Sequence, residues 1–435
     1  NEVLAFSKAE FSNNDSILTI QKNCNGVISQ IYILNASNSK VTIATEVEKV
    51  DNGYEIKSHR DIPKLFCDFP LIGTEAFHFP VIVNSFYFNP QIERDGIWLK
   101  GSDDSEVVEN QSLLEEALEL YKSLLDKVSS ENFYNIFNMT NSKLPDTTEK
   151  YFDEYWYRES IQKPLREYLL TKPIIELEND SKEKKLSKDV WFPSRSFSKD
   201  IREKFWQYTY DLYNDAVCKQ KHIQEWVEVS WSDWNTLDYE ELAKDLEKQS
   251  SIEKLSEELG KNETDTFNWY NEVAKFLLEI ESNIIFFQNR KILPNQNGDF
   301  RLKKDVYIDE IEDEELISIL SLLGNDWRKL LLHNNVNFGK YQVKRKKHIA
   351  DEISERLKNP SHNDENVISA ISLLSEWFEA NPKEAKDIMP ELYRKRAQLF
   401  MNTIPDKESL YKVMRSKADL SQLSKVAKAL EDDPN

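Results

Sequence analysis

The chain has 435 residues and a formal net charge of −20. Hydrophobic residues make up 40% of it and aromatic residues 11%, which is enough for large buried cores and excludes an intrinsically disordered protein. The acidic balance disfavours broad nucleic-acid binding, because a negative surface repels phosphate groups.

Residues 1–107 have the pattern of an antiparallel sheet. Runs at 17–20, 28–34 and 41–47 are rich in β-branched and aromatic residues. Turn signals at 25–26, 35–38 and 51–53 separate or follow them, and such short connections favour hairpins. The run at 77–84 is apolar enough for a buried strand. We therefore expect an antiparallel, β-rich domain over 1–107.

The hydrophobic period changes at Ser112. Apolar residues from Leu113 to Val128 recur at helical spacing, and this helix ends near Ser129. Helical patterns dominate to about residue 280, with short strands expected at 173–177 and 190–193. An apolar run at 284–287, an Asn297-Gly298 turn signal and a Leu-rich helix at 312–323 follow. We expect 108–344 to form a mixed, mostly helical domain.

The rest of the chain reads as helix. Ile371, Leu374 and Phe378 lie four, seven and eleven positions after Val367, so these four residues form one apolar face of a helix. Asn381-Pro382 ends that helix, and another carries Leu392, Ala397 and Phe400. We expect 345–435 to be a helical bundle or a set of helical repeats. The predicted fold class of the whole chain is α+β, in three domains.

Several kinds of active site are excluded by the scarcity of glycine. No G-x-G sequence occurs, so Rossmann and kinase glycine loops are absent, and so is the D-x-G-x-G loop of the Hsp90-type ATP fold. Gly96 and Gly101 have the Walker A separation, but Ser102 stands where that motif needs lysine. The chain holds no complete active site of these classes.

The cysteine pattern fits a reducing compartment, and the hydropathy pattern predicts no membrane segment. Cys24, Cys67 and Cys218 are widely spaced and include no C-x-x-C, which argues against a disulfide framework and against a metal site. No signal peptide opens the chain, and no apolar run reaches the length of a membrane helix. We expect a cytoplasmic protein with no membrane partner. Because the chain begins without methionine, we also expect that it starts inside a longer gene product.

Two blocks of sequence carry a family resemblance. The first is LFCDFPLIGTE at 65–75, which runs on to NSFYFNPQIERDGIWL at 84–99. The second is LPNQNGDF at 293–300, with LGNDWR at 323–328. Both resemble elements of bacterial sacsin-like proteins, which are Hsp90-related (GHKL-type) ATP-binding proteins. In that family this region follows an N-terminal ATPase domain.

The resemblance has consequences for fold and cofactors. It implies that 1–107 is similar to the middle domain of Hsp90. It also implies that ATP and Mg²⁺ are bound by a preceding ATPase domain or by a partner chain, and that this chain alone binds no cofactor.

The resemblance also points to site residues. The domain after the ATPase supplies a basic residue that reaches the terminal phosphate, and Arg94 matches that position as the candidate catalytic residue. A guanidinium suits this role because its paired donors neutralise charge spread over phosphate oxygens. Asn84 and Asn89 are the candidate cofactor-binding residues. The alternative is that the two amides satisfy backbone groups in an irregular turn, and that Arg94 fixes that turn by pairing with Glu93, Asp95 or Asp68.

Other features have a structural interpretation that we favour. The basic run at 344–348 is typical of a solvated helix start, with nucleic acid or an acidic partner as the alternative. The acidic residues at 309–315 fit a helix N-terminus. His78 is expected to be a core or half-buried strand histidine. Aromatic residues around Trp156, Trp206 and 231–234 are expected in the core, with a groove for apolar client segments as the alternative.

The functional hypothesis follows from the resemblance. We expect the middle and C-terminal part of an ATP-dependent protein that couples nucleotide-driven movement of a preceding ATPase domain to the binding of a protein client or defence partner. The role is chaperone-like or antiviral, and ATPase activity is expected only together with the Hsp90-type domain. The alternatives are a non-enzymatic protein-interaction scaffold and a nucleic-acid-acting defence component.

Overall fold

The computed structural model describes most of the chain, in eight stretches: 2–5, 16–24, 27–101, 104–146, 150–179, 183–280, 288–360 and 364–402. The chain divides into two compact units, Asn1–Asp238 and Tyr239–Asn435. The boundaries expected from sequence, at 107 and at 344, lie inside these units. Each unit is described by itself.

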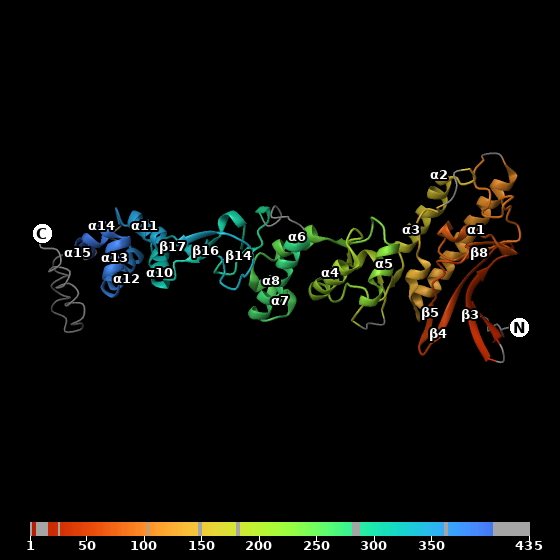
Figure 1. The fold of residues 1–435 in the computed structure, drawn as a ribbon, viewed down its shortest axis with the longest axis horizontal. Coiled ribbons are helices and arrows are strands. Elements are labelled where there is room, and N and C mark those ends of the chain that lie inside the picture. Colours follow the sequence, from red (N-terminus) through yellow and green to blue (C-terminus); the bar gives the residue numbers. More distant parts are fainter. Residues whose placement is uncertain are drawn as a thin grey trace. The chain divides into compact units, whose positions relative to one another are not determined.

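Unit 1 begins with a sheet that contains both antiparallel and parallel pairs (Figure 1). Its strand order is β1-β2-β3-β4-β8-β6-β7, and β5 joins β4 to β9. Pairs β6–β8 and β5–β9 are parallel, and the other pairs are antiparallel. The strands are β1 (Glu2–Ala5), β2 (Ile17–Cys24), β3 (Val27–Ser37), β4 (Thr42–Val50), β5 (Gly53–Ile56), β6 (Leu65–Cys67), β7 (Phe69–Pro70), β8 (Ile82–Asn84) and β9 (Phe133–Tyr134).

One face of this sheet is apolar because side chains alternate along each strand. In β4 the buried positions are Ile43, Thr45 and Val47, two residues apart. Helix α1 (Ser105–Ser130) contacts β3 and β4 and covers this sheet. Its apolar residues from Leu113 to Val128 are buried, as their spacing predicts. The Asp104 side chain caps the helix by accepting a hydrogen bond from the amide of Glu106.

The remainder of unit 1 is mostly helical. Its helices are α2 (Glu154–Tyr157), α3 (Lys163–Leu170), α4 (Lys199–Leu212) and α5 (Ile223–Val229), with a π-helical turn at Arg158–Gln162. Two short strand pairs are β10 (Pro173–Ile175) with β11 (Lys185–Leu186), and β12 (Phe192–Pro193) with β13 (Thr236–Leu237). Trp206 and Trp234 are buried, and Trp156 and Trp231 are partly buried against the same core, so the core interpretation holds for these tryptophans, whereas the neighbouring Tyr155 is 77% exposed.

Unit 2 begins with helices and a hairpin and ends in a helical bundle. Strands β14 and β15 form a hairpin whose turn contains Gly298, as predicted. Strands β16 and β17 pair in parallel. The elements are α6 (Tyr239–Gln249), α7 (Ile252–Leu259), α8 (Glu263–Ile280), β14 (Leu293–Pro294), β15 (Phe300–Arg301), β16 (Tyr307–Glu310), α10 (Glu314–Leu322), β17 (Gln342–Arg345), α11 (Lys346–Arg356), α12 (Glu365–Ala380), α13 (Pro382–Ile388), α14 (Pro390–Arg394) and α15 (Arg396–Asn402).

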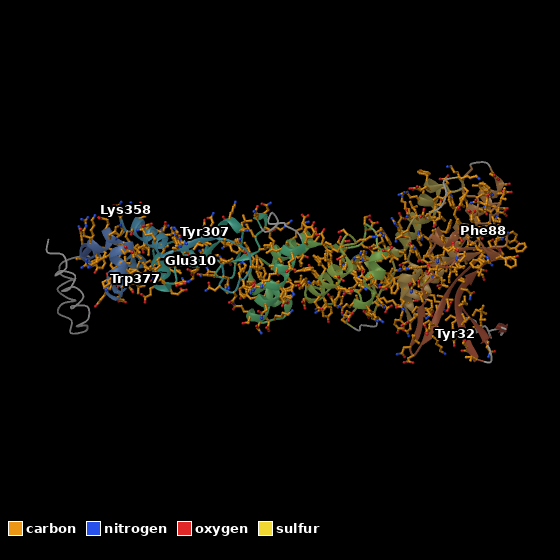
Figure 2. The ribbon with its side chains drawn as sticks, viewed as in Figure 1. Tyr32, Phe88, Tyr307, Glu310, Lys358 and Trp377 are labelled. Atoms are coloured by element: carbon orange, nitrogen blue, oxygen red, sulfur yellow. The ribbon has the colours of Figure 1, made fainter. Side chains whose placement is uncertain are left out.

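The core of the bundle comes from α10, α11 and α12. Trp377 is buried there, and its indole Nε1 donates to Asp313 Oδ2 at 3.0 Å (Figure 2). Asp313 also caps α10 by accepting from the amide of Leu316 at 3.2 Å. The acidic residues at 313–315 are thus a helix start, as expected, whereas Asp309 and Glu310 lie in strand β16 and not at the start of a helix.

The α+β class is confirmed, and several finer expectations are corrected. The run at 77–84 is not one strand, because only Ile82–Asn84 is extended in the sheet and Thr74–Phe77 is a 3₁₀ turn. The helix expected at 392–400 is divided into α14 and α15. The turn signal at 25–26 and the apolar run at 284–287 lie outside the described residues. In the part of the chain that the structure describes, no helix is both long and apolar enough to cross a membrane.

Candidate functional site

Strands β6 and β8 bring the predicted site residues into one corner of unit 1. Asn84 ends β8, where it pairs with Phe66 of β6 and Thr42 of β4. The chain then folds back, and Arg94 Nη2 donates to the carbonyl of Cys67 at 3.2 Å. Residues far apart in sequence therefore meet at the end of β6.

A buried asparagine holds the segment that carries Arg94. The Asn110 side chain, fully buried on α1, accepts from the amide of Asn89 at 2.8 Å and donates to the Asn89 carbonyl at 2.9 Å. It also donates to the carbonyl of Trp98 at 2.9 Å. The Asn89 side chain donates to Glu109 Oε2 at 2.8 Å. These contacts anchor both ends of the 89–98 segment to one helix.

Arg94 lies in a tight and strained turn between those ends. Its amide donates to the carbonyl of Gln91 at 3.0 Å, and the amide of Gln91 donates to Gly96 at 2.9 Å. The φ of Arg94 is 55°, a left-handed conformation that residues other than glycine rarely adopt. Backbone strain of this kind is often found at functional sites.

The guanidinium of Arg94 is exposed and has spare donors. It carries five N–H groups, and the hydrogen bond to Cys67 uses one nitrogen. Within the described residues it forms no ion pair, so pairing with Glu93, Asp95 or Asp68 is not seen. The structure thus leaves a fixed cation facing solvent.

Exposed apolar side chains lie on the Arg94 turn and on the segments next to it. Phe69 is the first residue of β7, and Ile72 lies two residues after the end of β7. Phe86 and Tyr87 follow β8, and Ile92 lies in the Arg94 turn. These side chains are between 50% and 91% exposed. We call Phe69, Ile72, Phe86, Tyr87, Ile92 and Arg94 the apolar corner.

The packing beneath the apolar corner is firm. Phe88, labelled in Figure 2, is only 3% exposed and lies between the exposed Tyr87 and the anchored Asn89. Cys67 Sγ is 3.5 Å from the Phe88 carbonyl. Ser85 Oγ donates to the carbonyl of Lys40 at 2.9 Å and accepts from the amide of Tyr87 at 3.1 Å. The exposed rings are therefore presented by an ordered backbone.

Sequence reasoning missed the apolar corner. The 65–99 block was distinctive, but its aromatic residues were indistinguishable from core residues by type. A usable signal is the density of turns, because Asp68, Gly73 and Arg94 all have positive φ. In short segments between such turns, some apolar side chains must remain exposed to solvent.

The basic run at 344–348 is engaged inside unit 2. Lys344 Nζ lies 4.8 Å from the ring centre of Tyr307 and 4.5 Å from that of Trp327. Arg345 Nε donates to Glu310 Oε2 at 2.9 Å, on the paired strand β16 (Figure 2). Lys346 pairs with Asp313 and Glu384, and Lys347 with Asp351. These intramolecular partners disfavour a nucleic-acid surface.

His78 is half-buried, as expected, but it is not in a strand. It follows the 3₁₀ turn Thr74–Phe77 with a φ of 55°, and its Nδ1 lies 3.5 Å from Asn141 Nδ2. Burial lowers the pKa of His78, and the nearby Lys143 lowers it further.

The structure and the comparisons identify no metal centre and no relative. Across the described stretches, no group of three or more histidine, cysteine, aspartate or glutamate side chains is placed to hold a metal ion. Comparisons with protein families, with curated proteins and with solved structures gave no match to this chain.

Proposed function

We propose that this chain is a coupling module that docks, through the apolar corner, on an ATP-binding domain of the same polypeptide or of a partner chain. It passes nucleotide-driven movement of that domain to a protein client or defence partner, in a chaperone-like or antiviral role. The observation that carries the proposal is an exposed arginine on an anchored turn, with exposed apolar side chains on the same turn and on the neighbouring segments.

The apolar ring supports docking on a protein. Single exposed apolar residues are common on protein surfaces, whereas a contiguous exposed group marks an interaction site. Three aromatic side chains, Phe69, Phe86 and Tyr87, belong to the group, and aromatic residues are enriched at interfaces. Glu93, which precedes Arg94 and is exposed, supplies part of a polar rim.

The arginine supports contact with a phosphate. Docking would exclude water around Arg94 and strengthen its interaction with an anion. Its spare N–H donors match the oxygens of a terminal phosphate. The exposed Asn84 side chain at the end of β8 is available to a ligand, whereas the Asn89 side chain is engaged by Glu109.

The fold proposal accompanies this function. The N-terminal sheet with α1 across it is the part proposed to be similar to the middle domain of Hsp90, and the chain is proposed to be sacsin-like. The ATP and Mg²⁺ sites then belong to the docked domain, and the helical bundle of unit 2 contacts partners.

The test is ATP hydrolysis by the assembly that contains both this chain and its ATP-binding domain. Arg94→Ala is expected to lower turnover on the order of a thousandfold, as loss of a phosphate-contacting arginine does. Arg158→Ala is the matched control, because Arg158 is exposed and its ion pair among the described residues is with Glu154, four positions earlier. Normal turnover in Arg94→Ala would refute the catalytic role.

A second candidate function is a non-enzymatic interaction scaffold, which the same apolar ring favours. Ile92→Asp places a charge at the most exposed apolar residue of the corner. A scaffold predicts that Ile92→Asp abolishes association with the partner while Arg94→Ala leaves ATP turnover unchanged. The coupling module predicts that both variants lose turnover. Tight ATP binding by the isolated 435-residue chain would contradict both functions.

A further inference from the structure

A second polar site lies in unit 1, in a cavity of about 170 Å³. Its walls come from four places in the sequence: the connection between β5 and β6, the turn around His78, the segment at 137–143 and the segment at 228–229. At about 30 Å³ per water, this volume holds roughly five or six water molecules. It is therefore large enough for a small ion or a small organic molecule.

The cavity is lined by a buried lysine with unused donors. Lys64 is only 4% exposed, and its Nζ donates to the main-chain carbonyl of His59. An ammonium group has three N–H donors, and buried charges are normally paired. In the described part of the chain Lys64 forms no ion pair. Because Lys64 lines the cavity, its remaining N–H donors are available to a ligand there.

A second cation lines the same cavity. Arg60 is exposed at the cavity wall and forms no hydrogen bond or ion pair with any described residue. Asn141 adds a neutral amide, whose Nδ2 lies 3.5 Å from His78 Nδ1. Arg60 and Lys64 from the β5–β6 connection and Asn141 from a distant segment thus line one cavity. This is the set of donors that oxyanions prefer in proteins.

The carboxylates of the cavity are already engaged. Glu228 is paired with Lys143, and Arg195 lies 3.7 Å from the same carboxylate oxygen. Glu75 accepts a hydrogen bond from the amide of Gly73 at 2.8 Å and forms no ion pair with Lys64. The cavity therefore stays locally cationic in a chain whose net charge is −20.

We propose that this cavity binds a small oxyanion, with Lys64 and Arg60 as its cationic ligands and Asn141 as a neutral donor. The shared chemistry is a compact group of anionic oxygens, either a phosphate or a carboxylate. This site is separate from the apolar corner and does not depend on the function proposed for it.

The protonation of Lys64 agrees with this assignment. The pKa of Lys64 is lowered to about 8, mainly by burial, even though the carboxylates of Asp61 and Glu75 oppose the shift. An anion bound beside Nζ would favour the charged form and raise this pKa again. Binding of the anion and protonation of Lys64 are therefore coupled.

Isothermal titration calorimetry on the whole chain tests the proposal. Inorganic phosphate and acetate are titrated in separate experiments, each at ionic strength matched with sodium chloride. Saturable one-to-one binding of either anion supports the site, and the tighter of the two identifies the source of the oxyanion. Lys64→Met and Arg60→Gln are each expected to weaken that binding at least about tenfold, the loss of one charge-assisted contact.

Lys57→Met controls for the loss of a surface lysine, and Arg60→Gln provides a test that does not depend on the folding of Lys64→Met. Lys57→Met is the matched control, because Lys57 is an exposed lysine seven positions away that pairs with Glu48, and it should bind like the wild type. Arg60→Gln changes an exposed residue and keeps the test valid if Lys64→Met does not fold. The proposal is overturned if neither anion gives saturable heat, or if Arg60→Gln binds as tightly as the wild type.

Discussion

Histidine 222 is expected to make unit 1 sensitive to mild acid. Its ring is 6% exposed and is 5.0 Å, centre to centre, from the ring of Phe137. Neither ring nitrogen has a hydrogen-bond partner among the described residues, and Nδ1 is completely buried. The pKa of His222 is lowered to about 4, mainly by burial; Glu176 opposes this shift, whereas Lys221 and Lys219 contribute to it.

The sign of the effect follows from proton binding. Between pH 6.5 and pH 4 the unfolded chain binds a proton at His222 and the folded chain does not, so acid favours unfolding. Between pH 7 and pH 5 this linkage removes about 2 kcal/mol from the free energy of unfolding. Partial solvent screening of the imidazolium reduces the expected loss to about 1–2 kcal/mol.

The perturbation is His222→Phe, which keeps an aromatic ring against Phe137 and removes the titration. Urea unfolding, followed by tryptophan fluorescence at pH 8, 7 and 5, gives the free energy of unfolding at each pH. The variant should lose about 1–2 kcal/mol less than the wild type between pH 7 and pH 5. From pH 8 to pH 7 the difference between the two proteins should stay nearly constant, which serves as the internal control. An equal loss in both proteins between pH 7 and pH 5 would refute this reasoning.

Two further predictions concern the framework of the site. Asn110→Leu removes three hydrogen bonds that hold Asn89 and Trp98, leaves buried polar groups unpaired, and should cost about 2–4 kcal/mol in urea unfolding. Gln111→Ala, which loses one such bond, should cost about 1 kcal/mol, and equal effects would contradict the anchoring role. Gly53→Ala would place Cβ 1.9 Å from the Asn132 carbonyl oxygen at a φ of 153°, so its melting temperature should fall far more than that of Gly260→Ala. At Gly260 nothing lies within 4 Å of the added carbon, and only the conformational cost of about 1 kcal/mol is expected there.

The regular elements of this fold were predictable because their patterns are local. The β-branched runs became β2, β3 and β4, and the helical spacing from Leu113 to Val128 became the buried face of α1. Apolar content predicted a strand over the whole 77–84 run. Pro80 has no N–H to donate to a neighbouring strand, and the positive φ of His78 bends the backbone, so only the end of the run is a strand.

The candidate site was predictable only in part. Sequence pointed to Arg94, Asn84 and Asn89, and the structure brings them to one corner, but their roles in nucleotide chemistry stay predictions. The exposed ring around Arg94 was not foreseen, since Phe69 and Phe86 have the composition of core residues. The oxyanion cavity was not foreseen either, because Lys64, Asn141 and Glu228 meet only through tertiary packing.

The parallel pair β16–β17 has a consequence for how unit 2 folds. A tight turn cannot join two parallel strands, so β16 and β17 are connected by residues 311–341, which include α10. Lys344 reaches the ring of Tyr307 only when the ends of this long connection have come together. The contacts of α10 with α12 span a still longer separation in sequence. Formation of this core therefore depends on distant segments meeting, and we expect it to be slow compared with the formation of hairpin β14–β15.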